Sequence, residues 1–294
     1  SENYLIDGDV PTFKIYDASE DKYYDAVVNE SPAYESFSVS NIIRMDASFY
    51  QNFDLHEGAN LVSFSVLPED NSISSMMESL DPGNNIVAVL TQEQAASYQG
   101  EWGWLGSLTH FELDAGYWLI MNNSDELSVQ SCDGPLQDQL VYDLSVGANL
   151  ISYPDKGHTD LSMAIPDEVE DSFVAVITEN GASLHTDNGW IGSVDSFIGG
   201  YGYWVIVDSD LSFSYEFDEV IGRNELHMQV ESLPMNGQFE VPQSSQQAFY
   251  FIDQVELSNG MMEHGDWLLT HKGESITGIR EWKGEIVDVP AMGH

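Results

Sequence analysis

The sequence predicts a mainly β, multi-domain protein in which one β-rich module with a single short helix occurs twice. The first observation is a pair of motifs that recur in the same order. They are LHEGANLVSF and LSVGANLISY at residues 55–64 and 144–153, and GYWLI and GYWVI at residues 116–120 and 202–206. The second observation is that the runs between them, such as IVAVL at residues 86–90, are short, apolar and rich in β-branched residues, as buried strands are. A repeat at a nearly constant offset marks one structural unit per copy, so we expect homologous modules at residues 51–135 and 136–219.

The elements of each module can be assigned in chain order. Residues 61–66 (LVSFSV) alternate between apolar and polar side chains, which predicts a strand. The Asn-Ser pair that follows is suited to cap a short helix over residues 73–80, and the turn sequence DPG ends it. Residues 95–104 predict a hairpin. In residues 116–120 both faces of the strand are apolar, which predicts a central strand covered on both sides. The second module repeats this order, with its helix expected at residues 161–165.

The two ends of the chain have no counterpart in the repeats. In the head, residues 1–50, we expect strands at residues 11–17 and 34–39. In the tail, residues 220–294, the expected strands are residues 225–230, 247–252, 266–270 and 284–289. Each end alone leaves strand edges unpaired, and two or three isolated strands are marginally stable in water.

The motifs GANL(V/I)S and GYW(L/V)I resemble the opening and closing motifs of repeat modules in secreted and cell-surface bacterial proteins. The resemblance covers residues 55–129 and 144–215. It implies export and a structural or binding role, and it carries no catalytic residue to this chain. Such modules often have tryptophan after the glycine, where this chain has Ala59 and Ala148, so packing that depends on that tryptophan is not expected.

The tail and the head, taken in that order, resemble a second module of the same extracellular group. Its first part is similar to GDWLL, WKGE and VPAMGH at residues 265–269, 282–285 and 289–294, and its second part to GDVPTFKIYD at residues 8–17. The resemblance implies one β domain, split between residues 220–294 as its first part and residues 1–50 as its second part.

Two arrangements would complete the split domain, and we favour the second slightly. It closes within one chain if the repeats fold back and bring the ends together. It closes between chains if the tail of one subunit completes the head of the next by strand addition. A head-to-tail contact of this kind that does not close on itself generates a filament. The candidate self-association residues are Phe13, Ile15 and Tyr16 on the head strand.

The chain is strongly acidic, with 8 Lys and Arg against 50 Asp and Glu and a formal net charge of −42. Its hydrophobic content of 42% is nevertheless that of a globular protein. The charge repels phosphate backbones and anionic lipids, and the apolar runs are too short to span a bilayer, so we expect no nucleic-acid partner and no membrane insertion. In about 0.5 M salt the Debye length is only a few Å, which screens the self-repulsion. We therefore expect an extracellular or cell-surface location in a marine or saline environment.

Cys132 is the single cysteine, so the sequence predicts neither an intramolecular disulfide nor a Cys/His zinc site. The sequence begins at Ser1 with no methionine and no signal peptide. We expect either a processed product or a piece of a longer protein.

The residues give little indication of catalysis. No matched position of the repeats carries a catalytic group, and no Gly-x-Ser-x-Gly motif is present. Among 50 acidic residues, neighbouring carboxylates arise by chance, so a glycoside-processing enzyme is the weakest of three hypotheses. No enzyme is therefore expected.

Two kinds of binding site remain open from the sequence. Acidic loops offer oxygen ligands for calcium, the one cofactor considered, although ordinary solvated turns explain them as well; the candidates are Asp70, Asp125, Asp208 and Asp210. Trp102 has no counterpart in the other repeat and is the candidate for stacking on a sugar ring.

The sequence thus predicts a non-enzymatic extracellular structural protein that self-assembles head to tail as a filament or surface-array subunit, with itself as the main partner. The alternative is a carbohydrate-binding region of a secreted protein, with glycans as partners.

Overall fold

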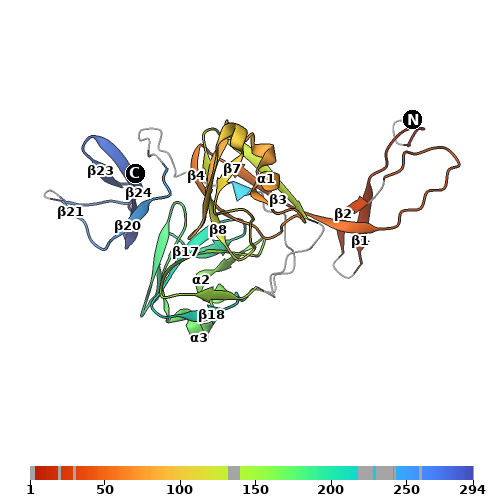
Figure 1. The fold of residues 1–294 in the computed structure, drawn as a ribbon. Coiled ribbons are helices and arrows are strands. Elements are labelled where there is room, and N and C mark those ends of the chain that lie inside the picture. The colour runs from red at the N-terminus through yellow and green to blue at the C-terminus, as the bar shows by residue number, and fades with distance from the viewer. Residues whose placement is uncertain are drawn as a thin grey trace.

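The structure is a computed structural model that describes residues 4–18, 21–28, 31–131, 140–217, 228–229, 241, 243–257 and 260–293. The protein is mainly β, as the sequence predicts, and its helices are single turns (Figure 1). None of the described helices is long and apolar enough to cross a membrane.

The first repeat forms a five-stranded antiparallel sheet with the order β4-β8-β5-β6-β7. Its strands are β4 (Gly58–Ser63), β5 (Ile86–Leu90), β6 (Ala95–Tyr98), β7 (Trp104–Gly106) and β8 (Gly116–Met121). β8 lies between β4 and β5, so the GYWLI motif is a central strand.

The second repeat forms a sheet with the matching order β11-β17-β13-β14-β15. Its strands are β11 (Gly147–Ser152), β13 (Phe173–Ile177), β14 (Ala182–Thr186), β15 (Gly189–Gly192) and β17 (Gly202–Val207). The register also matches, since Leu61 faces Trp118 in the first sheet and Leu150 faces Trp204 in the second.

Short helices lie beside each sheet. They are α1 (Ile73–Met76), η1 (Glu78–Leu80) and η2 (Gly100–Trp102) in the first repeat, and α2 (Leu161–Ala164) and α3 (Asp167–Glu170) in the second. Ser72 caps α1 as predicted, with its hydroxyl accepting the Ser75 N–H over 3.3 Å. The second repeat differs from the prediction of one helix, because Pro166 ends the first turn and α3 begins directly after it.

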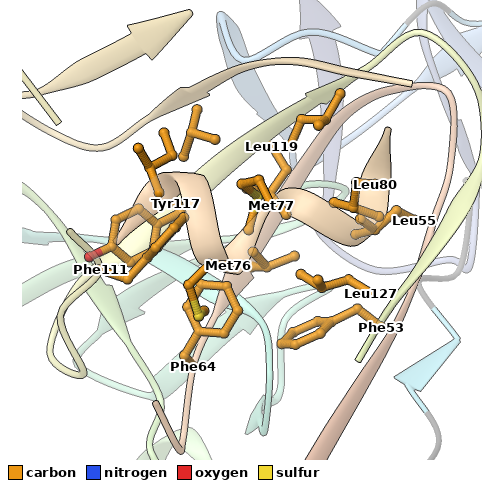
Figure 2. Close-up of a cluster of buried hydrophobic side chains, with 14 of the residues drawn as sticks. Phe53, Leu55, Phe64, Met76, Met77, Leu80, Phe111, Tyr117, Leu119 and Leu127 are labelled. Atoms are coloured by element: carbon orange, nitrogen blue, oxygen red, sulfur yellow. The ribbon is translucent and has the colours of Figure 1, made fainter. Parts of the chain in front are cut away.

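Each repeat encloses its own hydrophobic core. In the first, Phe53, Phe64 and Phe111 pack edge to face, and Met77 and Leu80 from the helical turns α1 and η1 belong to the same cluster (Figure 2). In the second, an aromatic cluster takes this place; its members are Tyr142, Tyr153, Phe173, Phe197, Tyr203, Phe213 and Tyr215. These aromatic contacts explain why so many tyrosines and phenylalanines occur in residues 140–217.

Short strand pairs complete both repeats. β9 (Asp125–Ser131) pairs with the long β3 (Met45–Leu55), β10 (Tyr142–Leu144) with β18 (Leu211–Phe213), and β12 (His158–Asp160) with β16 (Ser196–Ile198). The predicted boundary at residue 50 falls inside β3, which runs without interruption from the head into the first repeat. The predicted boundaries at residues 135 and 219 lie outside the described residues.

The head forms a hairpin that extends the β3–β9 pair. It consists of β1 (Phe13–Asp17) and β2 (Lys22–Val28), and β2 pairs with β3. The strand expected at residues 34–39 is wrong: these residues form no strand, and Phe37 has a φ of 63°, a left-handed conformation that interrupts an extended run.

The tail forms its own small sheets at the other end of the molecule (Figure 1). β20 (Gln247–Ile252) pairs with β25 (Val287–Met292), β23 (Trp267–Lys272) with β24 (Ser275–Glu281), and β21 (Glu256–Leu257) with β22 (Gly260–Met261). β19 (Met228–Gln229) joins the edge of β3; the rest of the strand expected at residues 225–230 lies outside the described residues.

The GAN motif has a local structural role in both repeats. Gly58 and Gly147 have φ values of 102° and 103°, which favour glycine. The buried amide of Asn60 accepts the backbone N–H of His56 over 2.9 Å and donates to its carbonyl over 2.8 Å. Asn149 makes the same pair of hydrogen bonds to the backbone of residue 145.

We expect Asn60→Ala and Asn149→Ala each to lower the free energy of unfolding by about 1 kcal/mol, because each removes a pair of part-buried hydrogen bonds to the backbone of the turn. Chemical denaturation measures the change. Asn84→Ala, at an exposed turn, is the control and should have a small effect. Equal stability of all variants would contradict this role of the motif.

Candidate assembly surfaces

The two repeats contact each other through equivalent residues. The backbone N–H of Ser63 donates to Gly200 O over 2.7 Å, and that of Ser152, its counterpart, donates to Asp114 O over 3.2 Å. Isolated bridges join Val62 to Tyr201 and Ile151 to Ala115. Since each residue on one side has its repeat counterpart on the other, the contact has approximate two-fold symmetry.

Side chains strengthen this contact in the same symmetric way. Leu150 N–H donates to Oε1 of Gln92 over 2.9 Å, and Leu61 N–H donates to Oε2 of Glu179 over 3.0 Å. Gln92 and Glu179 occupy equivalent positions, directly after the IVAVLT and FVAVIT strands. The two sheets are thus held by matched acceptors at the backbone of their opening motifs.

An apolar cluster fills the space between the sheets. Its buried members are Ala59, Leu61, Trp118 and Leu150, with Trp204 packed against them. Trp118 and Trp204 of the two GYW motifs therefore lie at the contact between the repeats. Their partners in the motif, Tyr117 and Tyr203, point into the cores, so the central strands are covered on both faces as predicted.

The buried tyrosines of the cores are structural. The hydroxyl of Tyr117 accepts the N–H of Glu112, and that of Tyr203 accepts the N–H of Ile198, each over 2.7 Å. Burial raises the pKa of both hydroxyls well above the usual value of 10.0. They stay neutral across the physiological range and hold the loops before the central strands.

The tail contacts the second repeat through hydrogen bonds made by both members of a buried ion pair, Arg280 and Asp288, which lies within the tail. Asp288 on β25 is fully buried, and its Oδ2 accepts hydrogen bonds from Ala182 N, Ser193 Oγ and Arg280 Nη2 over 3.1, 2.9 and 2.8 Å. Arg280 also donates to the carbonyl of Asn180 over 2.7 Å. Because Asp288 and Arg280 reach from the tail to the β13–β14 loop and the β14–β15 hairpin, they fix the tail beside the second repeat.

The head has an edge strand and a large exposed apolar surface. β1 is the edge strand of its sheet. Phe13 and Ile15 on β1 are partly buried, and Tyr16 is 48% exposed, with its hydroxyl donating to Asp21 over 2.7 Å. Other exposed apolar residues gather in the head; they are Tyr4, Ile6, Val10, Tyr23, Phe37, Val39 and Ile43. A long edge with apolar surroundings is a template for strand addition.

Within the described part of one chain, the head strand β1 does not pair with the tail strands of residues 247–292, and the tail joins the head's sheet only through β19, which pairs with β3 at Phe53 and Asp54. β1 pairs with β2, the sheets of residues 243–293 pair among themselves, and the two ends lie on opposite sides of the repeats (Figure 1). Closure of the split domain within one chain is therefore not found among these residues. Closure between chains stays a prediction.

The calcium candidates are each engaged locally. Ser72 donates from its side chain and its backbone to Asp70 and holds the pKa of that carboxyl below its usual value. Asp125 accepts from Asn85 Nδ2, Asp208 from Ser209 Oγ and Asp210 from Val146 N. In the part of the chain that the structure describes, no three His, Cys, Asp or Glu residues gather as metal ligands.

Trp102, the candidate sugar-binding residue, ends η2 and is 80% exposed. The recurring Trp104 and Trp190 are partly buried against the repeat cores. The exposure of Trp102 leaves its ring free to meet a flat ligand.

Comparisons with protein-family models, with curated proteins and with solved structures give no match.

The polar groups that hold the parts together were missed from the sequence. Gln92, Glu179, Arg280 and Asp288 carry no motif of their own. Gln92 and Glu179 have one sequence signal, which is their position directly after matching strands of the two repeats.

We expect Arg280→Met to loosen the tail, because it leaves the Asp288 carboxylate buried without its cation, at a cost of about 3–5 kcal/mol. Limited proteolysis should then cleave residues 243–293 faster than in the unmodified protein. Lys283→Met, at an exposed position of the same segment, is the matched control. Equal cleavage rates for both variants would show that the ion pair does not anchor the tail.

Proposed function

We propose that this protein is a non-enzymatic extracellular structural subunit that assembles head to tail, as a filament or surface array, with the tail of one chain completing the head of the next. The observation that carries the proposal is the separation of an edge-strand hairpin and a set of small sheets at opposite ends of one molecule. A head-to-tail contact between such ends that does not close on itself extends into a filament.

The chemistry of both ends supports a second copy of the chain as the partner. The head exposes Phe37 and Val39 almost completely, which is costly in water unless another surface covers them. In the tail, β20 has β25 as its single strand partner among the described residues, and it presents Tyr250 at 55% exposure. Strand addition between them supplies backbone partners to both and covers apolar surface.

The net charge supports an extracellular saline setting and limits when assembly occurs. Subunits that each carry a formal charge of −42 repel one another at low ionic strength. In about 0.5 M salt the Debye length falls to about 4 Å, so short-range apolar and backbone contacts decide association. The acidity therefore keeps the chain soluble, and screening of this charge by salt allows the subunits to assemble.

We expect the protein to form polymers in about 0.5 M NaCl and to dissociate in about 0.01 M NaCl, where the Debye length is about 30 Å.

The double variant Phe13→Asp/Ile15→Asp should weaken association by more than about 100-fold in 0.5 M NaCl, since each buried unpaired carboxylate costs several kcal/mol. Light scattering and electron microscopy measure both effects against the 32.7 kDa monomer. Deletion of residues 1–30 should abolish polymers and leave both repeats folded.

The matched control is Val141→Asp/Val146→Asp, which adds the same charge to exposed apolar residues of the second repeat, outside the head. It should retain polymers. Polymers that survive the β1 variant and the deletion would rule out assembly through this edge.

A second candidate function, glycan binding, is favoured by the 80% exposure of Trp102. Tryptophan stacks on sugar rings through its apolar face. In this case polysaccharide pull-down should retain the protein, and Trp102→Ala should reduce retention at least about tenfold, in line with the loss of about 1.4 kcal/mol. Leu105→Ala, at an exposed position nearby, is the control. Retention that is absent, or unaffected by Trp102→Ala, would remove this candidate.

A further inference from the structure

His56 and Glu179 form an ion pair where three parts of the chain meet. His56 lies at the turn between β3 and β4, and Glu179 lies in the loop between β13 and β14. Nε2 of His56 is 2.6 Å from Oε1 of Glu179, whose side chain is 2% exposed. The tail covers this point, since Gln243 donates to the side chain of Asn180 over 3.1 Å.

The hydrogen bonds of His56 favour a protonated ring. Nδ1 lies 2.7 Å from the carbonyl oxygen of Glu57, which accepts hydrogen bonds and cannot donate one. Nε2 faces the Glu179 carboxylate, which is also an acceptor when ionised. Only the imidazolium carries an N–H on both nitrogens. A neutral ring places one lone pair against an acceptor oxygen.

The repeat contains a matched reference for this contact. At the symmetric position, Gln92 accepts the Leu150 N–H through Oε1, while its Nε2 donates to the carbonyl of Ala148 over 3.2 Å. The counterpart of His56 there is Ser145. The Gln92 side of the contact between the repeats is thus neutral. The Glu179 side holds a buried carboxylate whose charge is balanced by His56 while that ring is protonated.

Few other charged groups face the pair. Glu57 is next to His56 in the turn, and its backbone carbonyl makes the contact described above. From the tail, Arg280 and Asp288 bind the backbone of Asn180 and Ala182, which follow Glu179 in the loop. Arg280 is already paired with Asp288, so His56 is the cation in direct contact with Glu179.

We propose that the His56–Glu179 pair is a proton-dependent latch, which holds the two repeats together while His56 is protonated and loosens their contact when His56 loses its proton. The latch lies within a single chain and does not depend on assembly. Loss of the proton removes the cation from the buried Glu179 carboxylate and sets one ring lone pair against an acceptor oxygen, that of Glu179 or of the Glu57 carbonyl.

The direction of the pH dependence follows from the pKa of His56. Burial opposes the charge of the ring, but the hydrogen bond and charge of Glu179, together with the Glu57 carbonyl, raise its pKa above the usual 6.5. A pKa that is higher in the folded than in the unfolded chain means that stabilisation is complete below pH 6.5. It is lost as the pH rises through the raised pKa of folded His56.

NMR titration of the histidine ring protons in the full chain tests the latch directly, with His56 assigned from the signal lost in His56→Ser. We expect His56 to titrate above 6.5. Glu179→Gln installs the residue found at position 92, and its amide can donate to a neutral ring, so the pKa of His56 should fall. A pKa of His56 at or below 6.5 in the unmodified protein would overturn the proposal.

The effect on the repeat contact is measured by unfolding and by amide hydrogen exchange in residues 58–64, compared with Glu179→Gln at each pH. The ratio of the unfolding constants of the two proteins should change by up to about tenfold per pH unit between pH 6.5 and the pKa of folded His56. Gln92→Glu, at the side without a histidine, is the control and should not create this dependence. Parallel pH profiles for the unmodified protein and Glu179→Gln would contradict the latch.

Discussion

The two-fold contact between the repeats determines where the other parts of the molecule lie. Ser63 and Ser152 bind backbone carbonyls of the opposite repeat, and Leu61 and Leu150 are held by Glu179 and Gln92. The head continues from the first repeat through β3, and the tail is fixed to the second repeat through Asp288. Because the contact sets the two repeats against each other in this way, the head and the tail lie on opposite sides of the pair (Figure 1).

The repeated motif therefore serves two purposes. Its glycine and asparagine build a turn within each repeat, while its leucine and serine make the contact between repeats. All four motif residues shape the backbone or make packing contacts. This explains why the matched positions of the repeats carry no catalytic side chain. The difference between Gln92 and Glu179 breaks the symmetry near the point where Gln243 of the tail hydrogen-bonds to Asn180.

Local patterns predicted much of the fold. Alternation at residues 61–66 marked the second half of β4, which ends at Ser63, the strands expected at residues 116–120 and 247–252 are β8 and β20, and the Asn-Ser pair located α1. Among the strands that were missed, β2 and β24 contain lysine, arginine or aspartate between apolar residues, and partner strands stabilise them. Residues 34–39 have strand-like composition, but the left-handed backbone of Phe37 prevents extension. Glu179 and Asp288 act on residues about 100 positions away, so spacing along the chain gives no sign of their partners.

Pairing of head and tail between subunits is the central claim of this account, and cross-linking of mixed isotopes tests it most directly. Equal amounts of ¹⁴N- and ¹⁵N-labelled protein are assembled in about 0.5 M NaCl and treated with a zero-length carboxyl–amine reagent, with Lys14 as the head amine. The account predicts cross-links from Lys14 to acidic residues of the tail in peptides of mixed isotope. Cross-links confined to one isotope, or head cross-links to the repeats alone, would contradict it.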